Sequence, residues 1–261
     1  MADGQVRGIF RHDLGVDMIT WGEDLVGPLV GAHRPADVLQ AAALCMAEEL
    51  RSDGFRWIKS RRCFERRGQG GRVERMTLEP SRHNRSGSFV RFAVAQLHVD
   101  EPDLGDWRTA NHLLTVVRPD GALDVLCATS CYDLVRVGFR NTVGLTRPEN
   151  RVAHLRALCD QIRQIVLPWF ASTRDPRQLA AIVPEALLGP FDFAPDLVEY
   201  LVLRGEREQA RLLIERVLEL DRKQREAFPE GRHLAGQGLA GRPRWHTPQA
   251  LGWTSAVLGL S

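Results

Sequence analysis

The sequence predicts an α+β protein in which an antiparallel sheet with flanking helices is followed by a helical C-terminal third. Three observations predict this class. Short apolar runs at strand spacing occupy residues 54–99, and glycine-rich or polar turns separate them. Beyond Leu145 the apolar spacing changes to the helical period of about 3.6 residues. The 261 residues are enough for one large domain or two small ones with a sizeable core.

The N-terminal 34 residues combine Gly and Asp with short apolar pieces, and Gly or Pro interrupts any longer element. We therefore expect an irregular segment there, with one edge strand at most. The first helix is predicted over residues 35–52, because Pro35 suits an early helical position and the apolar residues form one stripe. Gly54 is expected to end it in the left-handed conformation.

Three antiparallel strands are predicted over residues 54–67, 72–81 and 88–99. The third is apolar on both faces, which is typical of a central strand covered on two sides. An acidic loop is expected over residues 100–110. A hairpin is predicted over residues 112–127, since the sequence Arg-Pro-Asp-Gly at 118–121 favours a tight turn.

Residues 132–139 are compatible with one more strand or with the start of a helical connection. A helix follows from about residue 149, and Pro168 is expected to end or kink it. A second helix is expected from Asp175, and a helical pair at 196–204 and 206–222. Residues 229–248 are rich in Gly, Pro and Arg, which indicates a linker, and the apolar tail from Ala250 is expected to dock back.

Two segments resemble known families. Gly205, Ala210, Ile214, Val217 and the ending VLELD resemble one tetratricopeptide-type helical hairpin, with no second copy in the chain. Within residues 36–170 a predicted helix is followed by a Gly-Phe pair and by strands that contain arginine and phenylalanine. A serine-rich turn then leads to an apolar strand. This order resembles bacterial helix-plus-antiparallel-sheet families of unknown function, which implies a fold but no activity. We divide the chain into residues 1–170 (sheet and helices), 171–228 (helical hairpin region) and 229–261 (linker and docking tail).

Composition favours a cytoplasmic protein that is not a membrane protein. The N-terminus lacks the basic start and apolar run of a secretory signal, and no stretch reaches the roughly 18 apolar residues of a membrane span. The five cysteines are odd in number and lie in apolar contexts, as expected of buried reduced thiols. All but two of the 35 basic residues are arginine, which indicates either a GC-rich genome or recognition of anions by guanidinium groups.

Positive charge is concentrated in the predicted strands. Residues 51–91 contain twelve Lys or Arg and four Asp or Glu, although the whole chain carries a formal charge of only +2. We expect folding to gather these groups on one side of the sheet, with Trp57, Phe64 and His83 available for stacking. The alternative is that Glu65, Glu74 and Glu79 partner them across strands. The predicted binding residues are Arg61, Arg62, Arg66, Arg67, Arg82, His83 and Arg85.

Other constellations carry weaker signals. The GxGxxG pattern at 236–241 has no strand before it, so we interpret it as part of the linker. Cys127 and Cys131 are interpreted as packing residues, with a redox pair as the alternative. The acidic group after residue 98 is interpreted as a solvated loop and not a metal site. No catalytic motif is found; a spatial triad would draw on Ser86, Ser88, His83, His98 and His112. No metal and no cofactor are expected.

The function that these observations favour is non-enzymatic binding of an acidic partner through the arginine-rich sheet and the turn at 82–87. Two other classes stay open. One is a hydrolase or transferase acting on a phosphorylated substrate, with arginines holding the phosphate and a histidine as acid or base. The other is nucleic-acid binding through the same arginines. The expected partner is thus an acidic protein or a nucleic acid. The sequence does not decide whether the chain is an enzyme, and it does not give the oligomeric state.

Overall fold

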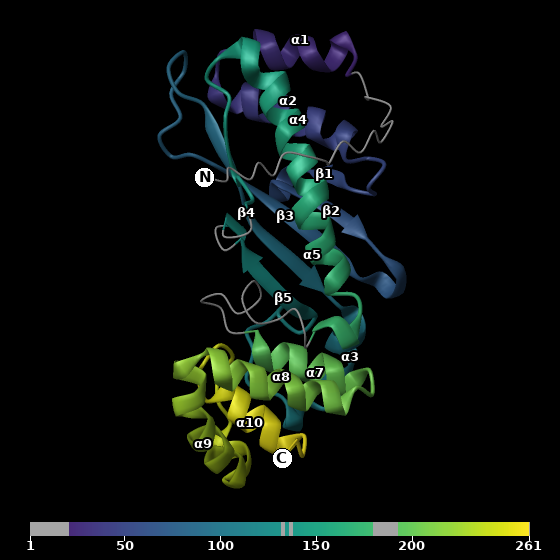
Figure 1. Ribbon diagram of the computed structural model, residues 1–261, viewed down its shortest axis with the longest axis vertical. Helices are drawn as coiled ribbons and strands as arrows, with labels where there is room; N and C mark the ends of the chain where they lie inside the picture. The colour runs from purple at the N-terminus through teal and green to yellow at the C-terminus, as the bar shows by residue number, and fades with distance from the viewer. Residues whose placement is uncertain (1–20, 132–133, 136–137, 180–192, 261) are drawn as a thin grey trace, which may run out of the picture.

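The computed structural model describes residues 21–131, 134–135, 138–179 and 193–260. An antiparallel sheet occupies the middle of an elongated molecule, with helices α1, α2 and α4 towards one end and helices α7 to α10 at the other (Figure 1). This arrangement confirms the α+β class. Among the described residues, none of the helices combines the length and the apolar character needed to cross a lipid bilayer.

The sheet has the strand order β1-β2-β3-β4-β5, and β6 also pairs with β4. Every pairing is antiparallel. The strand β4 is the longest and is central, as its two apolar faces predict. The bounds are β1 (Arg56–Ile58), β2 (Cys63–Arg67), β3 (Val73–Pro80), β4 (Arg91–Asp100), β5 (Val125–Ser130) and β6 (Thr142–Gly144).

The first predicted strand is in fact two strands. The chain leaves β1 through the 3-10 turn η1 (Lys59–Arg61) and reverses at Arg62, which has a left-handed backbone with φ 50° and ψ 44°. A non-glycine residue in this conformation is uncommon and gives no sequence signal. A hairpin between β1 and β2 therefore replaces the single strand expected over residues 54–67.

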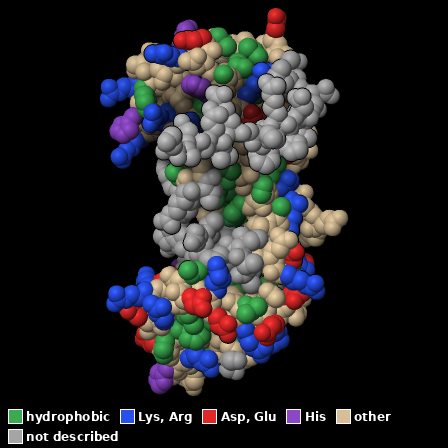
Figure 2. Space-filling model, in the orientation of Figure 1, with side chains coloured by type: hydrophobic (Ala, Val, Ile, Leu, Met, Phe, Trp, Pro, Cys, Tyr) green, Lys and Arg blue, Asp and Glu red, His purple; other side chains and the backbone are tan. Residues whose placement is uncertain are grey.

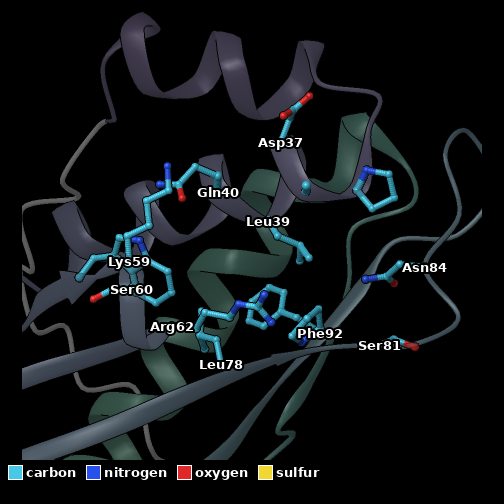
Figure 3. A pocket seen from close by; sticks show the side chains of 14 residues that line it. Asp37, Leu39, Gln40, Lys59, Ser60, Arg62, Leu78, Ser81, Asn84 and Phe92 are labelled. Atoms are coloured by element: carbon cyan, nitrogen blue, oxygen red, sulfur yellow. The ribbon is translucent and has the colours of Figure 1, made fainter.

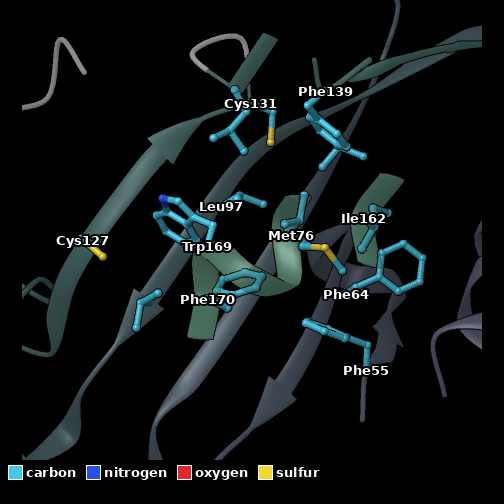
Figure 4. Packing of buried hydrophobic residues seen from close by; sticks show 14 of the residues in the cluster. Phe55, Phe64, Met76, Leu97, Cys127, Cys131, Phe139, Ile162, Trp169 and Phe170 are labelled. Atoms are coloured by element: carbon cyan, nitrogen blue, oxygen red, sulfur yellow. The ribbon is translucent and has the colours of Figure 1, made fainter. Parts of the chain in front are cut away.

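Helices cover one face of the sheet. They are α2 (Pro35–Glu49), preceded by α1 (Glu23–Gly31), and a long helix formed by α4 (Arg151–Gln161), the π-helical segment η6 (Ile162–Val166) and α5 (Leu167–Ser172). Phe64, Met76 and Leu97 of the sheet meet Trp169 and Phe170 in a close-packed core (Figure 4). Pro168 does not end the helix, because the π-helical turn before it changes the hydrogen-bonding pattern.

The C-terminal helices pack together at one end of the sheet (Figure 1). They are α7 (Ala194–Leu203), α8 (Arg207–Leu220), α9 (Arg222–Gly236) and α10 (Ala250–Val257). The expected helical pair is present as α7 and α8, with Gly205 at φ 78° in the turn between them. The expected docking of the tail is confirmed, since Trp253 of α10 is 1% exposed.

Four local expectations were wrong. The irregular N-terminal segment contains α1, and the acidic loop forms α3 (Pro102–Ala110). The first half of the expected linker is helical within α9, and the 3-10 turn η7 (Gly238–Gly241) follows it. The turn at 118–121 exists, but its hairpin does not: the Val117 N–H donates to Pro243 O at 3.0 Å, in place of pairing with β5. In each case packing against a distant segment overrides local propensity.

Two further expectations lie partly outside the described residues. They are the strand or helical connection at 132–139, and the helix from Asp175, of which residues 176–179 are helical.

A buried cluster of four charged side chains attaches the C-terminal helices to the rest of the molecule. Arg108 of α3 donates to Asp196 and to Glu199 of α7, both at 2.7 Å. Arg118 donates to the same two carboxylates at 2.9 and 2.7 Å. The side chains are at most 2% exposed. These contacts, between residues about 80 positions apart, fix α7 beside α3 and β5.

Candidate functional site

An open pocket of about 1010 Å³ lies between α2 and the sheet, and we call it the α2 pocket (Figure 3). Its size is at the upper end of the range for small-molecule sites. It is built from the start of α2, the β1–β2 hairpin, and the parts of β3 and β4 that flank their connecting turn. The lining residues are Pro35, Ala36, Asp37, Leu39, Gln40, Trp57, Lys59, Ser60, Arg62, Leu78, Pro80, Ser81, Asn84 and Phe92.

The floor of the α2 pocket is apolar. Leu78 and Phe92 come from neighbouring positions of β3 and β4 and are 9% and 2% exposed. Leu39 and Trp57 are half-buried and add walls from α2 and β1. Trp57 packs on the buried Phe64 at 5.1 Å between ring centroids, so its indole is held in place. An apolar surface this size attracts an apolar group of a ligand.

The rim of the α2 pocket carries two cations, Lys59 and Arg62, from the β1–β2 turn. The left-handed backbone of Arg62 is held at both ends, since its N–H donates to Lys59 O at 3.2 Å and its carbonyl accepts from the Leu78 N–H at 2.8 Å. Both side chains are exposed, and among the described residues neither meets a carboxylate. Backbone strain that the surrounding structure fixes in this way is typical of functional positions.

Two smaller depressions meet the α2 pocket at Pro80 and lie mainly on the other face of the sheet, since Glu79 and Ala93 alternate with Leu78 and Phe92 along β3 and β4. One, of about 400 Å³, includes Arg82, His83 and Arg91; the other, of about 390 Å³, includes Arg61 and Arg62. Pro80 lines all three hollows. Together the three are lined by five Lys or Arg and by two acids, of which Asp37 is already bonded to Arg34 at 2.6 Å. The indented surface around the end of β3 is therefore positively charged.

Arg66, one of the predicted binding residues, lies elsewhere. It is on the helix-covered side of the sheet, with its guanidinium 4.5 Å from the centre of the Phe55 ring. Its Nε donates to Glu74 Oε2 at 2.7 Å, and the side chain is 16% exposed. Because this arginine is enclosed and paired, we leave it out of the proposed site.

Arg61 and Arg67 lie on the second face of the sheet, the one opposite α2 and α5. Both surround the Glu65 carboxylate, at 3.8 and 3.3 Å, together with Arg56 and Arg75. The strand register places Arg56, Glu65, Arg75 and His98 in one row across four strands. Hydrogen bonds from Arg56 and then from Arg67 and Arg75 hold the pKa of Glu65 at about 2, below its usual 4.5.

We expect the free energy of unfolding to fall as the pH drops from about 4.5 to about 2, because the unfolded chain protonates Glu65 in that window before the native protein does. Replacing Glu65 by Gln should flatten this part of the stability profile, measured by urea unfolding at a series of pH values. Arginine side chains and not core atoms cover this carboxyl, so solvent screening reduces the effect. The exposed Glu79, which has no ion pair among the described residues, supplies the control Glu79→Gln. If the free energy of unfolding of Glu65→Gln depends on pH between about 4.5 and about 2 as steeply as that of the wild type, the ion-pair assignment of Glu65 is wrong.

The turn between β3 and β4 carries the other three predicted residues. Arg82, His83 and Arg85 are exposed, and no acid of the described chain pairs with them. Asn84 fixes the turn by exchanging two hydrogen bonds with the backbone of Arg91, at 2.9 and 2.8 Å. Figure 2 shows Lys, Arg and His side chains grouped on this part of the surface, at its upper left. The turn is thus a rigid support for exposed cations.

The expectation that the arginines gather on one side of the sheet was wrong, because successive side chains of a strand point to opposite faces. Glu65 and Glu74 neutralise much of the charge, as the alternative interpretation predicted. Phe64 is fully buried and is not available for stacking. The structure brings together Arg62, Arg82, His83 and Arg61 around Pro80, with Lys59 beside them.

The weaker constellations show no arrangement for chemistry. All five cysteines are free and buried, and burial raises the pKa of the Cys45 thiol to about 11. His98 contacts Asp100 at 2.6 Å, and Arg75 bonds that carboxylate too. No group of metal-ligating side chains occurs among the described residues. The GxGxxG pattern lies at the end of α9 and in η7, where no strand precedes it.

Sequence reasoning missed the α2 pocket. Leu39 carried only a helical-stripe signal, and Leu78 and Phe92 carried only strand signals. The one sequence feature that sets a pocket residue apart is that Lys59 is one of only two lysines in an arginine-rich chain. Comparison with known protein families, with characterised proteins and with solved structures finds no match to this chain.

Proposed function

We propose that this protein is a non-enzymatic binding protein that engages an acidic partner through the α2 pocket and its two adjoining depressions. One observation carries the proposal. Four cations of residues 51–91 without an acidic partner among the described residues (Lys59, Arg62, Arg82 and Arg91) line this surface, and Arg85 lies in the adjoining turn, whereas Arg56, Arg66, Arg67, Arg72 and Arg75 are ion-paired. Unneutralised charge at a rigid, hollowed surface favours binding of an anion.

The shape of the surface supports an acidic protein over a nucleic acid. Single-stranded nucleic acids are bound by exposed aromatic rings on which bases stack. Here Phe64 is buried and Trp57 is half-buried in the floor of a concave pocket. An apolar cavity with a charged rim is instead typical of protein interfaces that receive an anchoring side chain.

A hydrolase or transferase for phosphorylated substrates is the second candidate function. One observation favours it: His83 lies beside Arg82 and Arg91 in the same depression, so a phosphate there would meet both guanidinium groups and an imidazole. The Arg82 Nε and His83 Nε2 are 3.4 Å apart. Turnover of p-nitrophenyl phosphate that His83→Ala abolishes would support this function over simple binding.

Fluorescence anisotropy with a labelled Asp/Glu-rich peptide and with a single-stranded DNA of equal charge tests the proposal. We expect the peptide to bind more tightly, and its affinity to fall as salt rises from about 50 to about 200 mM. The combined variant Lys59→Ala and Arg62→Gly, and the triple alanine variant of Arg82, His83 and Arg85, should each weaken binding at least about tenfold.

The matched control is Arg222→Ala on α9, where the arginine is 82% exposed and its ion pair is with Glu226, also exposed. It removes one positive charge far from the α2 pocket and should leave the affinity unchanged. If Arg222→Ala weakens peptide binding as much as the pocket variants do, the affinity depends on the overall charge of the protein and not on this surface. Tighter binding of the DNA would favour the nucleic-acid alternative.

A further inference from the structure

We propose that the acidic partner is a peptide segment with an aromatic or branched aliphatic anchor residue, which enters the α2 pocket while its flanking carboxylates contact the surrounding cations. This inference rests on the proposed function and specifies its ligand. It follows from three properties of the surface: an apolar floor, a cationic rim, and continuation into neighbouring hollows.

The apolar floor requires an apolar group in the ligand. Leu78, Phe92, Leu39 and Trp57 come from four different elements, and Pro35 and Pro80 close the sides. A polyanion without an apolar group would leave this surface hydrated, and the free energy of burying it would be lost. An anchor side chain in a pocket with a polar rim is the usual arrangement of binding hot spots.

The rim requires negative charge beside the anchor. Lys59 and Arg62 lie on the hairpin side of the α2 pocket, and Figure 3 shows Arg62 next to Leu78 and Phe92. The acid of this pocket, Asp37, is bonded to Arg34 by two hydrogen bonds. A carboxylate within one or two residues of the anchor would therefore meet two cations and little repulsion.

The continuation of the surface favours an extended peptide over a compact small molecule. Both adjoining depressions meet the α2 pocket at Pro80, on the edge of β3 that lies beyond the end of β2, and they add Arg82 and Arg91 to the surface. A ligand confined to the α2 pocket would leave Arg82 and Arg91, which have no acidic partner among the described residues, without a counter-charge. A chain of several residues that passes around this edge reaches both arginines, with the anchor at its centre and acidic residues on both sides.

Arg62 allows a substitution that separates binding from folding. Because its backbone is left-handed, Arg62→Gly removes the guanidinium and also relieves the conformational strain. We expect this variant to melt at the same or a higher temperature than the wild type while it loses affinity. Ala36→Trp is the complementary variant: Ala36 is exposed in the first turn of α2 and lines the pocket, so an indole there would fill it and leave every charge in place.

The experiment is selection from a library of 12-residue peptides whose flanks are fixed as Asp and Glu and whose four central positions are randomised. We expect enrichment of Trp, Phe, Leu, Ile or Met at the centre. Replacing that anchor by Ser should weaken binding about tenfold, equivalent to about 1.4 kcal/mol. Ala36→Trp should abolish the preference for an anchor while acidic peptides still bind, and Arg62→Gly should weaken all of them.

The outcomes distinguish the two proposals. If acidic peptides bind whatever residues stand at the centre, the anchor inference is wrong and the proposed function stands. If acidic peptides bind no better than peptides with Asn and Gln flanks, both are wrong. If Arg222→Ala loses as much affinity as Arg62→Gly, the assignment to this surface fails.

Discussion

Replacing Asp196 by Asn is expected to lower the free energy of unfolding by about 3–5 kcal/mol, the usual cost of breaking a buried ion pair from one side. Asp196 is fully buried and accepts hydrogen bonds from Arg108 and Arg118 at 2.7 and 2.9 Å. It also accepts from the indole N–H of Trp245 at 2.9 Å. The variant would leave two buried guanidinium groups facing the single carboxylate of Glu199.

Urea unfolding monitored by circular dichroism measures this loss. Asp160→Asn is the matched control, because Asp160 is 64% exposed and 3.9 Å from its partner Arg163; a change within about 0.5 kcal/mol is expected there. Adding Arg118→Met to Asp196→Asn removes the excess cation and leaves Arg108 paired with Glu199. The double variant should therefore be more stable than the sum of the single effects predicts. Strict additivity would show that the four charges do not act as one cluster.

Replacing Gly252 by Ala is expected to destabilise the protein by about 1–3 kcal/mol, although alanine favours a helix by about 1 kcal/mol. A Cβ on Gly252 of α10 would lie 2.1 Å from the Phe228 carbonyl oxygen of α9. On the opposite helix, a Cβ on Gly231 would lie 2.1 Å from the Gln249 carbonyl oxygen. The two backbones therefore touch, and neither atom belongs to a flexible side chain that could move aside.

Gly236→Ala is the control for this substitution. Gly236 ends α9 in open space, with no atom within 4 Å of the added Cβ, so the change should be neutral or slightly stabilising. Thermal unfolding of the two variants side by side makes the comparison. Equal stability of Gly252→Ala and Gly236→Ala would contradict the close approach of α9 and α10.

Local sequence patterns correctly identified the helices and strands that have a clear apolar period and clear residues at their ends. The helix α2, the strands β3 and β4 and the pair α7 and α8 have the period and the end signals that their backbone needs. Two of the failures lie where Gly or Pro suggested an interruption. Pro28 is inside α1 and Pro229 is inside α9, and both helices persist because one side of each packs against other segments, at Leu29 of α1 and at Gly231 of α9.

The candidate site was predictable only in part. The surplus of arginine between residues 51 and 91 was visible in the sequence, and the turn at 82–87 proved to be exposed. Which arginines stay unpaired was not visible. Arg67 is paired with Glu65 of its own strand and Arg66 with Glu74 of the next, so their neutralisation depends on strand register and on the face each side chain takes.

By itself the sequence determined the fold class, the order of the main helices and strands, and the surplus of positive charge in the sheet region, because these depend on spacing and composition along the chain. Tertiary structure alone decided that Arg118, a residue of a predicted surface turn, is buried against carboxylates about 80 residues away. It also decided that Leu39, Trp57, Leu78 and Phe92 form one pocket beneath Lys59 and Arg62. The physical reason is the same in both cases: charge neutralisation and cavity shape depend on contacts between distant segments, which local periodicity does not record.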